Sequence, residues 1–200
     1  MPIVKMKNFY LDEELIASQI EHLYSFCRSF VYFRAISARK IPVTHANKTY
    51  FTHIANVSAL NSIIQFCNIF NMNPNMCKIH WTKIAPKNGI DIDGNEVDNS
   101  SFHVTVYEIL KNSVGKSNKK YKAYIKSMSN FRNKYAAHYD VNEIPEMPFL
   151  DNAFSIANAY LTWLRDEIPW NGDPQKNLAE IKPSFEAEIA AVLPAAPAQQ

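Results

Sequence analysis

The stretch LDEELIASQIEHLYSFCRSFVYFRAISAR, residues 11–39, decides the fold class of this chain. Its apolar side chains recur at steps of three and four residues, the period of one face of an α-helix. The members of this stripe are Ile16, Ile20, Leu23, Cys27, Phe30 and Val31. Carboxylates at residues 12–14 favour a helix start through the helix dipole, and Pro42 marks the end. The sequence therefore predicts one long helix over residues 11–39.

Four further segments of the chain repeat the helical period. The predicted long helices cover residues 48–71, 102–111, 119–138 and 149–163, and a short helix covers residues 76–84. Residues 90–97 alternate around an Asp-Gly turn, which predicts a small hairpin insertion. Only four of the 200 residues are glycine, which favours helices over turn-rich β folds. The sequence therefore predicts an all-α bundle of four to five main helices.

The distribution of charge and proline divides the chain. Residues 1–139 carry 18 Lys and Arg against 9 Asp and Glu, a net +9, whereas residues 140–200 carry 3 against 10, a net −7. We expect a helical domain over residues 1–168, followed by a partly mobile, acidic tail rich in Pro and Ala over residues 169–200, with an amphipathic piece at 185–193. A basic body is typical of a protein that faces a polyanion. The two parts could equally attract each other or be solvated.

The chain lacks the signals of export and membrane insertion. No basic start leads into an apolar run, and no stretch approaches the ~18 apolar residues that cross a bilayer. Three cysteines do not make a secreted disulfide framework, and Cys27 and Cys67 lie on predicted apolar faces as small core residues. The sequence predicts a cytoplasmic protein with no membrane partner.

Three short motifs suggest phosphate or metal chemistry, and each lacks a required part. The sequence GKS at 115–117 lacks the glycine that a phosphate loop needs five residues earlier, where Leu110 stands. In residues 91–94 a glycine comes fourth, too early for a calcium loop. Cys77 and His80 have metal-ligand spacing but no second pair. We therefore expect no metal and no cofactor.

Residues 109–139 combine eight Lys and Arg with no Asp or Glu, and aromatic side chains lie between them. Phosphate contacts supply most of the affinity for nucleic acid, so a basic helix of this kind is typical of RNA binding. A solvated lysine face over a core stripe would give the same pattern. The candidate nucleic-acid-binding residues are Lys119, Lys120, Lys122, Lys126, Lys134, Tyr135 and Tyr139.

The end of this segment, FRNKYAAHYD at residues 131–140, holds an arginine, a polar residue and, six positions after the arginine, a histidine. It resembles the Arg-x(4–6)-His motif of the HEPN superfamily. The helix order over about residues 10–168 is similar too: two long helices, a variable middle, a helix with the motif near its end, and a closing helix. The resemblance implies a metal-independent endoribonuclease, usually a homodimer in which motifs from two subunits form one cleft.

The resemblance implies catalytic roles for Arg132, Asn133 and His138. His138 can exchange a proton with a ribose 2′-hydroxyl or the leaving 5′-oxygen. Arg132 can hold the phosphate and offset the charge that gathers on it, and Asn133 can orient either partner. On a regular helix Arg132 and His138 lie ~120° apart, so a cleft between subunits, or a helix that ends before His138, is needed to bring them together.

Bacterial toxin–antitoxin or phage-defence biology is the setting that the resemblance implies, with RNA as substrate and an antitoxin or regulatory protein as partner. In some HEPN toxins a modifiable tyrosine stands two positions after the histidine. Here Tyr139 directly follows His138, so that regulation is not expected. Two other interpretations stay open: a non-catalytic HEPN-like module that binds nucleotide, nucleic acid or a protein partner, and an all-α regulatory protein that matches the motif by chance.

Overall fold

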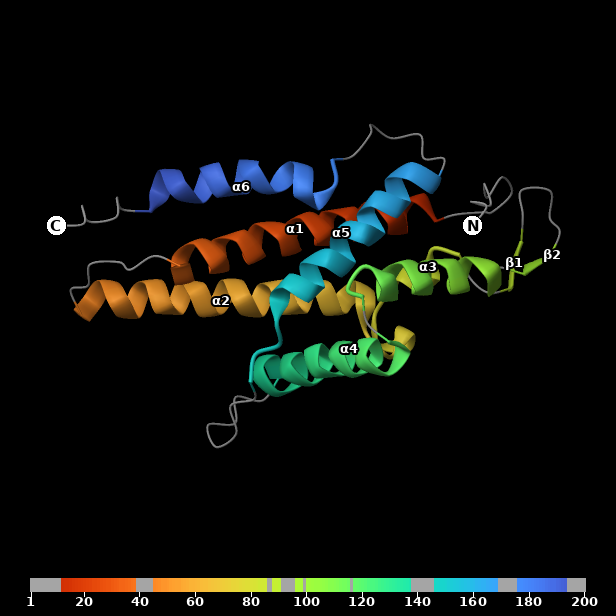
Figure 1. Ribbon diagram of the computed structural model, residues 1–200, viewed down its shortest axis with the longest axis horizontal. Coiled ribbons are helices and arrows are strands. Elements are labelled where there is room, and N and C mark those ends of the chain that lie inside the picture. Colours follow the sequence, from red (N-terminus) through yellow and green to blue (C-terminus); the bar gives the residue numbers. More distant parts are fainter. Residues whose placement is uncertain are drawn as a thin grey trace.

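Two long antiparallel helices, α1 (Glu13–Ala38) and α2 (His45–Phe70), form the spine of the molecule (Figure 1). The computed structural model describes residues 12–38, 45–85, 88–90, 96–98, 100–115, 117–137, 146–168 and 176–193. The predictions of both helices are confirmed, although α2 begins three residues earlier than predicted. The two helices pack against each other along their length, as the apolar stripe in residues 11–39 requires.

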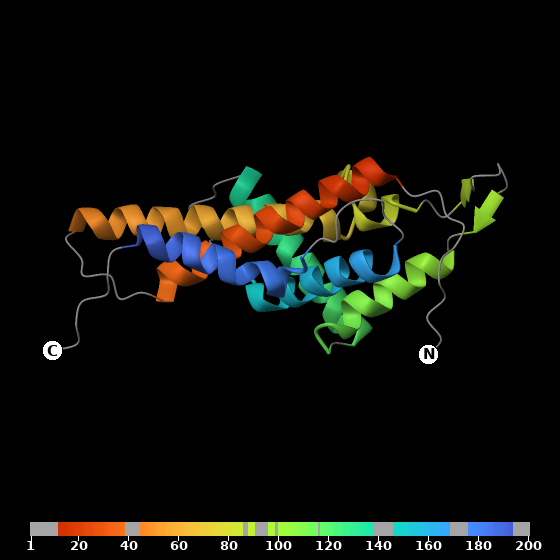
Figure 2. The same cartoon turned by 90° about the horizontal axis from the view of Figure 1, so that it is seen from above.

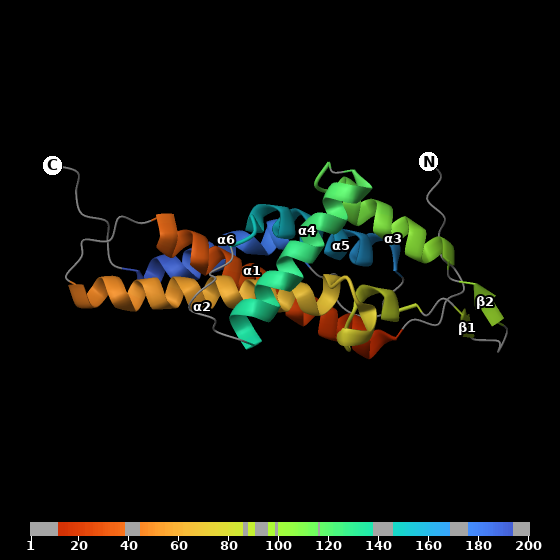
Figure 3. The same cartoon turned by 90° about the horizontal axis from the view of Figure 1, so that it is seen from below.

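Four shorter helices complete the bundle, so the all-α prediction is confirmed with six α-helices in the described residues. Helices α5 (Leu150–Glu167) and α6 (Leu178–Val192) pack on α1, and α3 (Ser100–Asn112) packs on α5. Figure 2 shows α3, in light green, beside α5, in cyan and blue. Helix α4 (Asn118–Arg132) crosses α2 obliquely (Figure 3). Figure 1 places α4 on the side of α2 that faces away from α1 and α6.

The predicted hairpin is confirmed as two short antiparallel strands, β1 (Asn88–Ile90) and β2 (Glu96–Asp98); its turn lies outside the described residues. The predicted short helix at 76–84 is wrong. Two 3₁₀ turns, η1 (Pro74–Met76) and η2 (Trp81–Lys83), stand there instead. The side chains of Asn73 and His80 accept backbone N–H groups at the start of these turns, and such local bonds compete with a continuous helix.

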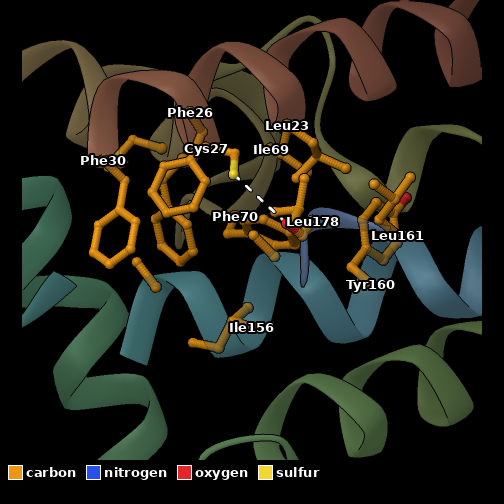
Figure 4. Packing of buried hydrophobic residues seen from close by; sticks show 14 of the residues in the cluster. Leu23, Phe26, Cys27, Phe30, Ile69, Phe70, Ile156, Tyr160, Leu161 and Leu178 are labelled. Carbon is orange, nitrogen blue, oxygen red and sulfur yellow. Dashed lines mark hydrogen bonds between the residues drawn. The ribbon is translucent and has the colours of Figure 1, made fainter. Parts of the chain in front are cut away.

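The core lies where α1, α2, α5 and the start of α6 meet (Figure 4). All six members of the stripe in residues 11–39 are buried. The ring of Phe70 on α2 packs edge-on against Tyr160 of α5, with centroids 5.4 Å apart. The thiol of Cys27 on α1 donates to the backbone oxygen of Leu178, 3.8 Å away, which joins α6 to the core.

A buried glutamine ties three parts of the core together. Gln19 of α1 is fully buried. Its Nε2 donates to the backbone oxygen of Ile79 at 3.0 Å, and its Oε1 accepts a 2.7 Å bond from the hydroxyl of Tyr160. Burial raises the pKa of Tyr160 well above its ordinary value. Because a buried polar group without a partner is costly, these bonds help to fix how α1, α5 and the 71–80 segment pack.

The last described helix, α6, lies in the C-terminal part of the chain and is longer than the amphipathic piece expected there. Within the predicted tail of residues 169–200, α6 begins seven residues before the amphipathic piece expected at 185–193. A reciprocal capping box starts it, in which Asn177 and Glu180 each accept the other's backbone N–H at 2.9 Å. Although Pro183 lies inside the helix, burial of Leu178, Phe185 and Ile189 against the bundle offsets its missing N–H bond. The packed bundle therefore continues beyond residue 168, as far as Leu193.

Cys27, Cys67 and Cys77 are all buried and free. Burial raises the pKa of the Cys27 and Cys67 thiols to about 12, so both stay protonated and unreactive near neutral pH. This confirms their interpretation as core residues. In the part of the chain that is described, no helix has the length and apolar character needed to cross a bilayer.

Candidate nucleic-acid interface

Helix α4 turns its aromatic stripe inward. Five members of the predicted apolar stripe are buried: Tyr121, Tyr124, Ile125, Met128 and Phe131. The hydroxyl of Tyr124 donates to the backbone oxygen of Phe149 at 2.9 Å, and the ring of Tyr121 packs edge-on against Tyr107 of α3 with centroids 5.4 Å apart. These rings are therefore core residues, and the outward face of α4 is left to its polar side chains.

The outward face of α4 carries Lys119, Lys120, Lys122 and Lys126, all exposed. We call these four residues the lysine face. None of them forms an ion pair with another described residue. An amphipathic helix with buried aromatics and unneutralised lysines has the form of an electrostatic footprint for a polyanion.

The acidic C-terminal part of the chain neutralises α1 instead. Glu188 of α6 lies 3.4 Å from Arg28, and Asp151 of α5 lies 3.1 Å from Arg34. Figure 1 shows α6 and α4 on opposite sides of the spine. The basic part (residues 1–139) and the acidic part (residues 140–200) therefore form ion pairs at α1. Among the described residues, no such pair involves the lysine face.

Arg132 closes α4, and Asn133 holds its guanidinium group. Atoms Nε and Nη2 of Arg132 donate to Oδ1 of Asn133 at 3.1 and 2.9 Å. Asn133 also begins η3 (Asn133–Ala137), one turn of π-helix. The α-helix predicted up to residue 138 thus ends at Arg132, and a wider turn follows as far as Ala137. Single π turns inside or after α-helices are frequent at functional sites.

The structure brings together only some of the predicted site residues. Arg132 and Asn133 are in contact, and Lys134 and Tyr135 follow them on η3. Lys134 is exposed, whereas Tyr135 is half-buried. The predicted residues His138 and Tyr139 lie outside the described residues. That Arg132 and His138 come together in one site therefore stays a prediction.

Two residues that flank Arg132 in the chain, Phe131 and Tyr135, line a groove that the sequence does not reveal. The rings of Phe131 and Tyr135 stack with centroids 5.1 Å apart and planes 5° from parallel. They form one wall of a groove of about 390 Å³. Its lining residues are Phe33, Asn56, Ala59, Leu60, Phe131, Tyr135, Glu146 and Met147. Since they come from α1, α2, α4, η3 and the segment before α5, no local pattern in the sequence could have found them.

The metal-like pair Cys77 and His80 is part of the core. His80 Nδ1 accepts the backbone N–H of Thr82 at 3.2 Å, and Nε2 contacts the backbone oxygen of Asn71 at 2.8 Å. Burial lowers the pKa of His80 to about 4, so its ring is neutral and donates from Nε2. The thiol of Cys77 donates to the backbone oxygen of Cys67 at 3.3 Å. Among described residues, no group of three or more His, Cys, Asp or Glu is placed to hold a metal ion.

A second cavity of about 440 Å³ lies between α1, α5 and α6. The charged side chains on its rim are paired with each other: Arg34 with Asp151 at 3.1 Å, and Lys182 with Glu186 at 3.4 Å. Pairing of this kind leaves little charge to attract a ligand. The lysine face and the groove lined by Phe131 and Tyr135 are therefore the stronger candidates for a functional surface.

No protein-family model matches the chain, and neither curated proteins nor solved structures give a match. The resemblance to the HEPN superfamily consequently rests on residues 131–140 and on the order of the helices.

Proposed function

We propose that the chain is a metal-independent endoribonuclease of HEPN type that binds RNA along the lysine face of α4. The observation that supports the proposal is the row of exposed lysines with no acidic partner among the described residues. At a helical rise of 1.5 Å per residue, Lys119 and Arg132 lie ~20 Å apart along α4. A strand that follows the lysine face thus reaches Arg132 at the end of the helix.

Arg132 is suited to receive a phosphate in this arrangement. Its guanidinium group is permanently charged and forked. Its described partner, the amide oxygen of Asn133, is neutral, so the positive charge is not cancelled. A fixed cation at the phosphate offsets the negative charge that builds up in the transition state.

His138 is the proposed proton carrier. It takes the proton of the ribose 2′-hydroxyl, whose oxygen attacks the adjacent phosphorus. The bond from phosphorus to the 5′-oxygen breaks, that oxygen takes up one proton, and protonated His138 releases the proton it removed, directly or through solvent. The products are a 2′,3′-cyclic phosphate and a free 5′-hydroxyl, so atoms and charge balance without a metal. A homodimer would supply the residues from two subunits to one cleft, and an antitoxin or regulatory protein would restrain the site.

Cleavage of RNA in the presence of EDTA tests the proposal. The proteins to compare are the wild type, Arg132→Ala, His138→Ala and a control, Lys176→Ala, which changes an exposed lysine outside α4. We expect each change to lower the cleavage rate by ~10² or more, because acid–base catalysis by His138 and charge stabilisation by Arg132 each contribute about that much. We expect the control to cleave normally. Equal rates for all four proteins, or an absolute need for metal, would contradict the proposal.

The second candidate is an RNA-binding module without catalysis. It is favoured by one feature of α4: the lysine face can hold a phosphate backbone whether or not His138 is active. Wild-type protein that binds RNA and leaves it intact, with affinity falling steeply as salt rises, would favour this second function.

A further inference from the structure

The groove lined by Phe131 and Tyr135 differs in chemistry from the lysine face of α4. Its walls are aromatic and aliphatic, and two of its lining side chains, Asn56 and Glu146, are polar. It contains a carboxylate and no Lys or Arg. A phosphate is therefore a poor occupant, although Arg132 lies directly between Phe131 and the π turn in the sequence.

The stacked pair Phe131 and Tyr135 supplies a flat wall for another ring. Their planes are 5° from parallel, and Ala59, Leu60 and Met147 add further apolar surface to the groove. Unpaired nucleobases stack on aromatic side chains in this way, whereas paired bases inside a duplex do not present their faces. The aromatic lining of the groove thus suits a base that has left the stack.

The two polar side chains discriminate between bases. A carboxylate such as that of Glu146 only accepts hydrogen bonds. It can accept a hydrogen bond from the exocyclic amino group of cytosine, adenine or guanine, whereas the corresponding keto oxygen of uracil would be repelled. Asn56 offers an amide, which pairs with the amino group and ring nitrogen of adenine. Glu146 forms no ion pair with another described residue, so its carboxylate is available to a ligand.

We propose that this groove binds one unstacked nucleobase that carries an exocyclic amino group (adenine, cytosine or guanine) in preference to uracil. The inference rests on the proposed function insofar as it requires that RNA bind along α4. It adds a substrate preference: a single-stranded site with adenine, cytosine or guanine at the end of α4.

Binding of uncleavable oligonucleotides tests the preference. The probes are fluorescent 12-residue strands of A, C or U with 2′-O-methyl riboses, which carry equal charge and have no 2′-hydroxyl to react. Anisotropy with the full wild-type chain measures each dissociation constant. We expect the A and C strands to bind at least ~5-fold tighter than the U strand, because a matched polar contact favours the correct base by about tenfold or more.

Two charge-matched variants complete the experiment. Glu146→Gln adds a donor that can serve the keto oxygen of uracil, so the three affinities should converge to within ~2-fold. Glu14→Gln removes an exposed carboxylate at the start of α1 and should leave the preference intact. Such convergence in Glu146→Gln alone would support the groove as the site of discrimination.

Other outcomes separate the inference from the proposed function. Equal binding of A, C and U strands by the wild type would overturn the base preference and leave RNA binding along α4 intact. A preference that Glu146→Gln does not change would overturn the role of the groove. If no strand binds, the proposed function and the inference both fail. A clear preference in a chain that never cuts unmodified RNA would support the groove and contradict catalysis.

Discussion

The guanidinium group of Arg132 donates both of its described hydrogen bonds to a single atom, Oδ1 of Asn133, the next residue in the chain. The partner is a neutral amide. By contrast, Arg28 and Arg34 on α1 face the carboxylates of Glu188 and Asp151. Arg132 is thus held in place with its charge intact, which is what contact with a phosphate requires.

Asn133→Asp is therefore expected to weaken RNA binding at Arg132. The new carboxylate neutralises the guanidinium, and the loss of one phosphate contact lowers the slope of log affinity against log salt by ~0.7 for a single strand. Asn133→Ser is the matched comparison, because it removes the amide without adding charge, and its slope should stay that of the wild type. Binding curves at several salt concentrations measure both. Identical slopes for the two variants would refute the charge argument.

Removal of two lysines from α4 should also lower the salt dependence. Lys122→Gln combined with Lys126→Gln is expected to reduce the slope by ~1.4, or ~0.7 for each lost phosphate contact. The control is Lys176→Gln with Lys182→Gln, which makes the same change in net charge near α6. Both proteins are measured by anisotropy against the same RNA. If the control shows the same drop, the attraction arises from overall charge and the lysine face has no special part.

Burial of His80 makes stability depend on pH in a predictable direction. Its pKa falls from 6.5 to about 4 on folding, chiefly because burial penalises the charged ring. Between these values the unfolded chain binds more protons than the folded one, so the stabilisation is complete above pH 6.5 and is lost as the pH falls towards 4. The loss amounts to about 3 kcal/mol. In the variant His80→Gln, the side chain at this position does not titrate between pH 4 and 6.5.

Urea unfolding of both proteins at pH 7 and pH 4.5 measures the effect of His80. We expect the wild type to be the more stable protein at pH 7 and its advantage over His80→Gln to shrink by about 2–3 kcal/mol at pH 4.5. Carboxylates that titrate in this range are common to both proteins, so the difference isolates the histidine. An advantage that stays constant across the range would show that His80 is not held neutral by burial.

The bond between Tyr160 and Gln19 should matter far more than an exposed bond of the same type. Tyr160→Phe leaves the buried Oε1 of Gln19 without its donor, at a cost of about 1–3 kcal/mol. Tyr24→Phe removes an exposed hydroxyl that donates to the backbone oxygen of Lys176, and we expect it to cost less than ~1 kcal/mol. Thermal and urea unfolding measure the loss of stability in each variant. Similar losses in both would argue against a special role of the Tyr160–Gln19 bond in holding the core together.

Periodicity in the sequence was sufficient to predict helices α1 to α5. The stripe in residues 11–39 required a long helix with one buried face, and α1 has that face against α2 and α5. Local chemistry explains the two misses. Side-chain bonds from Asn73 and His80 replace a short helix with separate turns. The prediction missed the first half of α6, which contains Pro183. The capping-box residues Asn177 and Glu180 are the sequence signal of where this helix begins.

The candidate site was predictable only as far as it is local. Arg132 and Asn133 are neighbours in the chain, so their contact follows from the sequence. The lysine face follows from helical spacing, once the aromatic residues between the lysines are known to be buried. The groove depends on how α4 crosses α2, because Asn56 and Glu146 meet Phe131 only in the folded chain. No spacing rule encodes that crossing.

The position of α6 gives the molecule two electrically distinct sides. A chain that held RNA with α4 would keep α6 on the far side of the spine (Figure 1), where each of the three glutamates of α6 is paired with a Lys or Arg side chain. The net charge of the whole chain, +2, would then differ from the local charge on either side. Such a difference would orient the chain as it approaches a polyanion, with the lysine face foremost.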